Sequence, residues 1–374
     1  MKSDTKTRVG LLTLPLGKAS LTPLSHLVEI LYNISARFTL VTGNEGYALY
    51  NGEHHFPVYD ISYKIDNSVW QIVRYCIGQT KASMLLIRTT KEVDCWFFFG
   101  GQRSVVPIVL AKLFHKRVII VMVGSAVKEC LLSQDRYLKF VRILSSTSLS
   151  LADKIIVYSS NLVQEWDLES YQQKILIAHR HFLDFNTFTV TTPLPDRAPL
   201  IGYIGRLSGE KGVQHFAQAL PAILSDRQDL HVLIGGDGQL KETIEVSLQE
   251  QALTARVDIP GWISHDDLPQ YLNQLRLLIL PSYTEGLPNI MLEAMACGTP
   301  VLATPVGAIP DVIIDGKTGF IMENNSPECI AENVKRALDS PDLERIAENG
   351  RRFVEENFTF EKTVENWRRI LQEG

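Results

Sequence analysis

The apolar positions of this chain fall into short runs separated by helical patterns. In the first half, largely apolar runs occur at residues 8–14, 38–42, 94–99, 117–123 and 154–158. Because these runs do not alternate with polar residues, they predict strands covered on both faces of a parallel sheet. Apolar residues at Leu24, Leu27, Ile30 and Leu31 follow the helical period and predict a helix after the first strand.

The same rhythm restarts in the second half. Strands are predicted at 200–204, 230–234, 257–259, 277–280, 301–304 and 319–321, with helices at 211–224, 240–251, 268–273 and 361–372. The stretch TTPLPDRAP (191–199) has three prolines and no periodicity, which is typical of a linker. We therefore predict an α/β protein with two doubly wound, Rossmann-like domains. The predicted division is residues 1–190, a linker at 191–199, residues 200–357, and a terminal helix at 358–374.

Composition agrees with this division. A chain of 374 residues exceeds the size at which one core usually stops growing. Its apolar runs are far shorter than the roughly 20 residues that span a bilayer, and no secretory leader is visible. The five cysteines are scattered without a C-x-x-C pair, which favours reduced thiols in the cytoplasm over disulfides or a zinc site.

Charge is divided unevenly along the chain. Residues 1–190 hold 21 Lys and Arg against 15 Asp and Glu, whereas the remainder carries a net charge of −11. Residues 128–150 combine basic and apolar positions and predict a basic amphipathic helix. Both features fit an anionic partner, such as a phosphorylated acceptor or a membrane surface. A solvated surface, and a helix with its apolar side in the core, explain them equally well.

Two carboxylates bracket a turn in PSYTEGLPNIMLEAMACGTPV (281–301). Glu285 follows the predicted strand 277–280, Pro288 suits the first helical position, and Glu293 lies inside the helix. The amides of residues 286–289 and the positive helix end between them can bind an anion, while carboxylates accept hydrogen bonds from diols. A capping Glu285 and a solvated Glu293 are the structural alternative.

The stretch GYIGRLSGEKGV (202–213) brings two cations to the end of another strand. Arg206 and Lys211 follow Gly205, so both backbone and side chains can approach phosphates. The stretch is neither a Walker loop nor a G-x-G-x-x-G fingerprint, which disfavours a nicotinamide-dependent oxidoreductase. Two exposed cations on a solvated face remain the alternative. The His179-x-His181 pair is more often structural than metal-binding.

Five glycine-rich strand ends in this order resemble the nucleotide-sugar half of the retaining glycosyltransferases of family four, which have the GT-B fold. The resemblance rests on the Glu285–Glu293 element with its flanks and on four further groups: Gly205-Arg206 with Glu210-Lys211-Gly212, Gly235-Gly236-Asp237-Gly238, Gly261-Trp262, and Gly307-Ala308-Ile309-Pro310. It is dense over residues 198–322, and the first half shares only the rhythm.

The resemblance implies roles for these residues. Arg206, Lys211 and Glu285 would be catalytic: the two cations would neutralise the donor diphosphate, and Glu285 would contact hydroxyls of the transferred sugar. Glu293 would hold the ribose, and the backbone at Trp262 and Ile263 would meet the base. The remaining donor contacts would come from the backbone of Gly17, Gly205, Gly236, Gly286, Leu287, Pro288 and Asn289.

The implied activity is a cytoplasmic, retaining transferase that moves a sugar from a nucleotide diphosphate to a hydroxyl acceptor. It would need no cofactor, no nucleic acid and, since the chain has no D-x-D triplet, no metal. The implied fold places the site in a cleft between the domains, with the terminal helix crossing back onto the first domain. A glycan acceptor and a lipid-linked acceptor at the membrane both remain open.

The first half departs from the family pattern. Val123 stands where many relatives have a histidine that reaches the donor sugar, and Leu16-Gly17 replaces the usual pair of glycines. These departures keep a second hypothesis open, in which the chain is a non-catalytic, nucleotide-sugar-binding or scaffold subunit of a glycosyltransferase complex.

Overall fold

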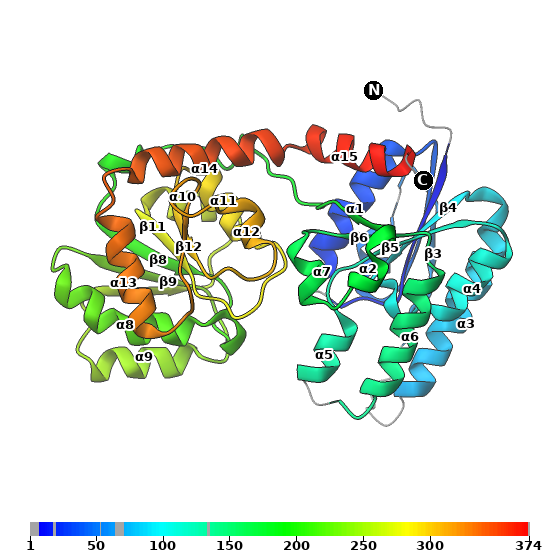
Figure 1. Ribbon diagram of the computed structural model, residues 1–374, viewed down its shortest axis with the longest axis horizontal. Helices are drawn as coiled ribbons and strands as arrows, with labels where there is room; N and C mark the ends of the chain where they lie inside the picture. Colours follow the sequence, from blue (N-terminus) through cyan, green and yellow to red (C-terminus); the bar gives the residue numbers. More distant parts are fainter. Residues whose placement is uncertain (1–6, 18–19, 53, 64–70, 133–134, 373–374) are drawn as a thin grey trace. The chain divides into compact units, whose positions relative to one another are not determined.

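The computed structural model describes residues 7–17, 20–52, 54–63, 71–132 and 135–372 (Figure 1). The chain divides into two compact units, each built around one parallel sheet. Unit 1 comprises residues 1–180 and 363–374, and unit 2 comprises residues 181–362. No helix in the described part of the chain is long and apolar enough to cross a membrane.

Unit 1 contains a seven-stranded sheet in the order β3-β2-β1-β4-β5-β6-β7. Its strands are β1 (Arg8–Thr13), β2 (Arg37–Thr42), β3 (Val58–Asp60), β4 (Cys95–Phe99), β5 (Arg117–Val121), β6 (Lys154–Val157) and β7 (Ile175–Ile177). All neighbouring pairs are parallel, as the unbroken apolar runs predict. Strand β4 is buried along its whole length, with Trp96, Phe97 and Phe98 fully covered.

The helices of unit 1 connect these strands. They are α1 (Leu21–Ile34), α2 (Glu45–Tyr50), α3 (Gln71–Thr89), α4 (Val105–Leu113), α5 (Ala126–Leu132), α6 (Leu138–Leu151) and α7 (Asn161–Glu165). No helix or strand was predicted for the segment that forms α3.

The last helix, α15 (Phe360–Gln372), belongs to unit 1 from Thr363 onward. The Arg117 guanidinium donates to the carbonyls of Leu371 at 2.8 Å and Ile370 at 3.1 Å. The fully buried Trp367 donates its indole N–H to the His179 carbonyl at 2.8 Å. These bonds fix the terminal helix to the first unit.

The single basic helix predicted at residues 128–150 is wrong. Helix α5 ends at Leu132 and α6 begins at Leu138. The Asp135 carboxylate accepts the Tyr137 amide at 2.9 Å, and the Asp135 carbonyl accepts the Leu138 amide at 3.1 Å. An aspartate that bonds to the backbone two residues ahead favours a turn over a continuing helix.

Unit 2 contains a six-stranded sheet in the order β10-β9-β8-β11-β12-β13. Its strands are β8 (Leu200–Ile204), β9 (His231–Gly235), β10 (Val257–Gly261), β11 (Leu277–Leu280), β12 (Val301–Ala303) and β13 (Phe320–Ile321). Its helices are α8 (Val213–Asp226), α9 (Lys241–Glu250), α10 (Leu268–Gln274), α11 (Asn289–Ala296), α12 (Ile309–Val312), α13 (Pro327–Leu338) and α14 (Leu343–Asn357). Helices α13 and α14 lie in a region without a prediction from the sequence.

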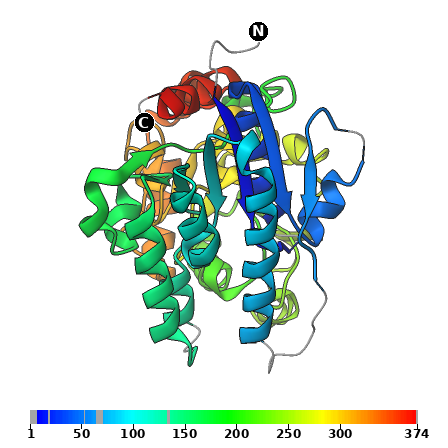
Figure 2. The same cartoon turned by 90° about the vertical axis from the view of Figure 1, so that its right-hand side faces the viewer.

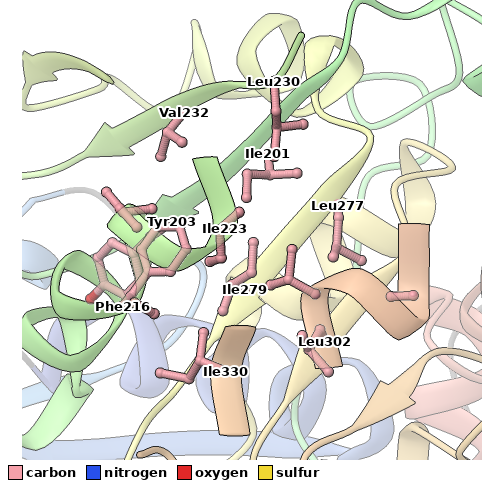
Figure 3. Packing of buried hydrophobic residues seen from close by; sticks show 14 of the residues in the cluster. Ile201, Tyr203, Phe216, Ile223, Leu230, Val232, Leu277, Ile279, Leu302 and Ile330 are labelled. Carbon is pink, nitrogen blue, oxygen red and sulfur yellow. The ribbon is translucent and has the colours of Figure 1, made fainter. Parts of the chain in front are cut away.

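Side chains from five of the six strands of unit 2 pack into two cores, one on each face of the sheet, whereas the edge strand β10 contributes to one of them. Ile201, Tyr203 and Ile279 contribute to one apolar cluster, which also contains Phe216 of α8 (Figure 3). Leu278 and its neighbours on the other face of the sheet pack against α11. Strands that are buried on both faces have apolar residues at successive positions, which explains the continuous apolar runs in the sequence.

The predicted linker at residues 191–199 is part of unit 2. Leu194 is in its core. Arg197 is only 4% exposed and donates to the carbonyls of Leu275 and Cys297 at 2.8 and 2.7 Å and to the Thr299 hydroxyl at 2.7 Å. The prolines break periodic structure here, but the buried guanidinium ties the stretch to the sheet, so the boundary lies near residue 180 and not 190.

Candidate functional site

The two loops singled out by the sequence leave neighbouring strands. Strands β8 and β11 are adjacent, and their order in the sheet marks the point where the chain reverses its direction of travel across the sheet. In parallel α/β sheets, ligands bind at the carboxyl ends of the strands on either side of such a switch point. Arg206 and Lys211 follow β8, and Glu285 follows β11.

Lys211 and Glu285 form an ion pair at this switch point. The Lys211 ammonium lies 2.7 and 2.8 Å from the two carboxylate oxygens of Glu285. The Ser282 hydroxyl donates to the same carboxylate at 2.7 Å. The Glu285 side chain is 8% exposed and that of Lys211 is 23% exposed, so both charges are largely desolvated and held in one arrangement.

The backbone of Arg206 is hydrogen-bonded, whereas its guanidinium group is exposed to solvent. The Tyr203 hydroxyl donates to the Arg206 carbonyl at 2.7 Å. The guanidinium is 67% exposed and lies 3.4 Å from the Glu210 carboxylate. A hydrogen bond from Ser208, with smaller effects of other groups including Arg206, holds the pKa of the Glu210 carboxyl below its ordinary value. Arg206 is therefore a cation free to turn toward an anion at the strand ends.

Glycines bring the loops at this edge into direct contact. Gly236 has φ +133°, and a Cβ on it would lie 1.9 Å from the Gly205 carbonyl oxygen. Gly212 has φ +65°, and a Cβ there would lie 1.9 Å from the Pro281 carbonyl oxygen. Only glycine fits such approaches, so these residues pack the loop after β8 against the loops after β9 and β11.

The turn between β11 and α11 leaves several amides without a partner. Within the described residues, no hydrogen bond is made by the amides of Gly286, Leu287 or Asn289. The helix begins at Asn289, and Pro288, with φ −72° and ψ 120°, is its N-cap. Pro288 therefore precedes the first helical position predicted for it. Unpaired amides beside the positive end of a helix form an anion-binding arrangement.

Glu293 is a buried carboxylate within α11. The residue is 6% exposed, and the alternative of a solvated helix glutamate is therefore wrong. His265 Nε2 lies 3.3 Å from Glu293 Oε1, and the His265 ring packs edge-on against Phe188. The hydrogen bond to Glu293 raises the pKa of His265 above its ordinary value. His265 was not predicted as a site residue, because nothing in WISHDDL distinguishes this histidine from a surface residue.

The other residues expected at the site occupy different positions around it. Trp262 follows β10 and is 79% exposed, whereas Ile263 is partly buried and packs on the second core. Gly205 follows β8 directly and donates its amide to the Gly235 carbonyl at 3.0 Å. Gly17 follows β1 in unit 1, so it is not part of the constellation in unit 2.

The constellation consists of two cations, a paired carboxylate, a buried carboxylate and unpaired amides at one sheet edge. Cations and amides bind phosphates, and the carboxylates can accept hydroxyl hydrogen bonds. Over the described part of the chain, no group of three or more His, Cys, Asp or Glu side chains is placed to hold a metal ion.

The family comparison matches this region. Residues 184–353 match the model of the family described as glycosyl transferases group 1. Over 155 residues, the chain is 34% identical to alpha-D-kanosaminyltransferase of Streptomyces kanamyceticus, covering 41% of this chain and 40% of the relative. Over 161 residues it is 31% identical to the capsular polysaccharide biosynthesis glycosyltransferase CapM of Staphylococcus aureus, covering 43% and 42% of the two chains. The matches thus span less than half the length of these relatives.

The structural comparison covers the whole chain. HepE of Anabaena, in a crystal structure with UDP, superposes with a TM-score of 0.76 at 17% identity and covers 100% of both chains. Sucrose-phosphate synthase of Thermosynechococcus elongatus gives a TM-score of 0.72 at 16% identity and covers 100% of this chain and 99% of that one. The architecture of two Rossmann-like units is that of the GT-B fold, and residues 184–353, with the constellation at the β8 and β11 ends, match the glycosyl transferases group 1 family.

Proposed function

We propose that the chain is a retaining, metal-independent glycosyltransferase. It moves a sugar from a nucleotide-diphosphate sugar to a hydroxyl acceptor, and the donor binds at the carboxyl edge of the unit 2 sheet. The observation that carries this proposal is the pairing of Lys211 with Glu285 beside the unpaired amides that follow β11. A diphosphate and a sugar hydroxyl need these two kinds of group side by side.

In the proposed donor complex, Lys211 remains next to Glu285 and also contacts the diphosphate. Arg206, which is exposed and free to turn, supplies the second positive charge. The carboxylate of Glu285 accepts a hydroxyl of the transferred sugar, and Glu293 accepts the ribose hydroxyls. Each charge-assisted bond of this kind contributes roughly 1.5–3 kcal/mol.

The proposed reaction needs no protein nucleophile. The bond from the acceptor oxygen to the anomeric carbon forms on the face from which the diphosphate departs. The bond from that carbon to the phosphate oxygen breaks with its electron pair going to the diphosphate. The acceptor hydroxyl gives its proton to the departing phosphate oxygen, while the two cations stabilise the charge that develops there.

The nucleobase contact is proposed at the end of β10. Trp262 presents an exposed indole ring there, and such a ring can stack on a base. HepE, which shares this fold, was crystallised with UDP, which makes uridine nucleotides the first donors to test.

The same proposal predicts which replacements stop turnover. Glu285→Gln and Lys211→Ala should each lower UDP release from UDP-glucose by about a hundredfold. Glu245→Gln and Lys335→Met, which change charges elsewhere in unit 2, should leave the rate unchanged. Near-normal turnover in both site variants would contradict the assignment of these residues.

We also propose that unit 1 rests on an anionic membrane, where it would meet a lipid-linked acceptor. Figure 2 shows helices α3, α4 and α6 next to one another in one layer. Their outer surface exposes Met84 by 63%, Leu113 by 68% and Ile143 by 64%. The sequences of these three helices hold six Lys and Arg and no Asp or Glu. Exposed apolar side chains among basic residues are typical of surfaces that bind anionic lipid.

Vesicle flotation tests the membrane proposal. The wild type should float with vesicles that contain phosphatidylglycerol and should be released by salt. A triple variant with serine at positions 84, 113 and 143 should stay in the soluble fraction. Val246→Ser, at a residue that is 52% exposed in unit 2, is the control and should float. Absence of flotation at low salt would reject the proposal.

A further inference from the structure

Unit 1 contains a pocket whose residues are not among those of the donor site. It has a volume of about 280 Å³ and lies among α5, α6 and the segment that follows α7. This is nearly twice the roughly 150 Å³ of an engineered protein cavity that binds benzene. It therefore has room for a six-membered ring with polar substituents.

Hydroxyl groups line much of the pocket. Ser125, Ser145, Ser146, Ser170 and Tyr171 all line it. Ser145 is 4% exposed. Hydroxyl groups both donate and accept hydrogen bonds, so this wall of the pocket is suited to bind the hydroxyls of a polar ligand.

Two of the hydroxyls come from serines inside helix α6, and helix formation does not explain serines there. Arg142, Ser145, Ser146 and Leu149 line the pocket and follow the helical spacing of three and four residues, so they share one face of α6. Serine competes with the helix for backbone hydrogen bonds and is a poor choice for its interior. Residues that weaken a helix without improving its packing are expected at functional sites.

A buried glutamine fixes the side of the pocket nearest the sheet. The Gln102 side chain, 4% exposed, donates to the Gly124 carbonyl at 3.0 Å and to the Met122 sulfur at 2.8 Å. Its carbonyl oxygen accepts the Ala126 amide at 2.7 Å. These bonds hold the loop after β5 and the start of α5 in one position, so this part of the pocket wall is preorganised.

The pocket lining includes one cation, Arg142, and one anion, Asp167. Arg142 is exposed and makes no ion pair in the described part of the chain. The acidic residue of the lining, Asp167, is already paired with Lys128 at 2.9 Å. Trp166 adds an apolar ring face. An unpaired guanidinium suits a phosphate or carboxylate, the serines suit hydroxyls, and the indole suits the apolar face of a sugar ring.

We propose that this pocket binds a sugar that carries a phosphate or carboxylate group. The pocket residues belong to unit 1 and those of the donor site to unit 2, so binding at the pocket is tested separately from the proposed function. The same chemistry occurs at the end of a sugar acceptor and in a free sugar phosphate. With UDP-glucose present, a glycosylated product marks the ligand as an acceptor, and binding without product marks it as a separate ligand.

Calorimetric titration with glucose 6-phosphate, glucuronate, glucose and inorganic phosphate tests the site. Glucose 6-phosphate should bind more tightly than glucose or phosphate alone. Arg142→Gln should weaken its binding by about tenfold or more. Ser145→Val, which fills part of the pocket, should weaken binding of the neutral and the charged sugar alike.

Lys139→Gln is the matched control, because Lys139 is an exposed cation on the same helix that does not line the pocket. It should bind every probe as the wild type does. If Ser145→Val does not fold, Arg142→Gln still decides, since Arg142 is exposed. Wild-type affinity in Arg142→Gln, or no binding of any probe at millimolar concentration, would overturn the proposal.

Discussion

Removing Lys211 should destabilise unit 2 because it leaves the Glu285 carboxylate buried without its cation. The two side chains are 23% and 8% exposed. Breaking a fully buried pair from one side costs about 3–5 kcal/mol. Since Lys211 keeps some contact with water, we expect Lys211→Met to cost about 2–4 kcal/mol. For a unit of this size, that corresponds to a fall in melting temperature of roughly 4–16 °C.

A second replacement separates the charge from the packing. Glu285→Gln, added to Lys211→Met, removes the unpaired charge and should restore about 1–2 kcal/mol. Lys335→Met is the surface control, because Lys335 pairs with Asp226 at 3.0 Å with side chains that are 59% and 47% exposed. It should change stability by less than about 1 kcal/mol.

Scanning calorimetry gives the melting temperatures, and hydrogen exchange of peptides from β8 and β11 assigns the change to unit 2. Equal stability of Lys211→Met and Lys335→Met would contradict this prediction. A double variant less stable than Lys211→Met alone would contradict it too, because the remaining carboxylate would then not be the source of the cost.

Three further predictions concern backbone contact and pH. Gly236→Ala should destabilise unit 2 by roughly 2–5 kcal/mol through backbone strain and overlap. Gly209→Ala should leave stability unchanged, because a Cβ there meets nothing within 4 Å. Equal melting temperatures of the two variants would contradict this prediction. Burial, with repulsion from a nearby arginine, lowers the pKa of His26 from 6.5 to about 4, so its contribution to stability is full above pH 6.5 and is lost as the pH falls toward 4. His26→Gln should therefore flatten the pH dependence of unit 1 melting over that range, and an unchanged profile would refute it. The hydrogen bond to Glu293 raises the pKa of His265. The stabilisation of unit 2 by His265 is therefore full below pH 6.5 and is lost as the pH rises through the raised pKa. His265→Ala should abolish this pH dependence of unit 2 melting, and a dependence that persists would refute the assignment.

The strands could be predicted from sequence because parallel strands covered on both faces are continuous apolar runs. Residues 200–204 and 277–280 are strands in the structure with the predicted bounds. The helix expected from residue 211 begins at Val213, because Gly212 adopts φ +65° and separates it from a short 3-10 turn. A left-handed glycine at a helix start is not visible in the apolar period.

Sequence could not identify the partners at the site. Lys211 and Glu285 are 74 residues apart, and their contact depends on β8 and β11 being neighbours in the sheet. The His265–Glu293 contact depends in the same way on how the loop after β10 folds toward α11. The prolines at 191–199 predicted a linker because the period stops there, but the buried contacts of Arg197 come from residues more than 70 positions away.

The most direct test of the donor site is calorimetric titration of UDP-glucose, with EDTA present, into the wild type and Arg206→Ala. Arg206 is 67% exposed, so its replacement should leave stability within about 0.5 kcal/mol of the wild type. Arg345→Ala, at a side chain that is 65% exposed in the same unit, is the matched control. ADP- and GDP-sugars are titrated in parallel.

We predict metal-free binding of one nucleotide-sugar series, weakened by about ten- to a hundredfold in Arg206→Ala and unchanged in Arg345→Ala. Binding that is equal in all three proteins, or no binding of any nucleotide sugar, would contradict a diphosphate site at the carboxyl edge of the unit 2 sheet.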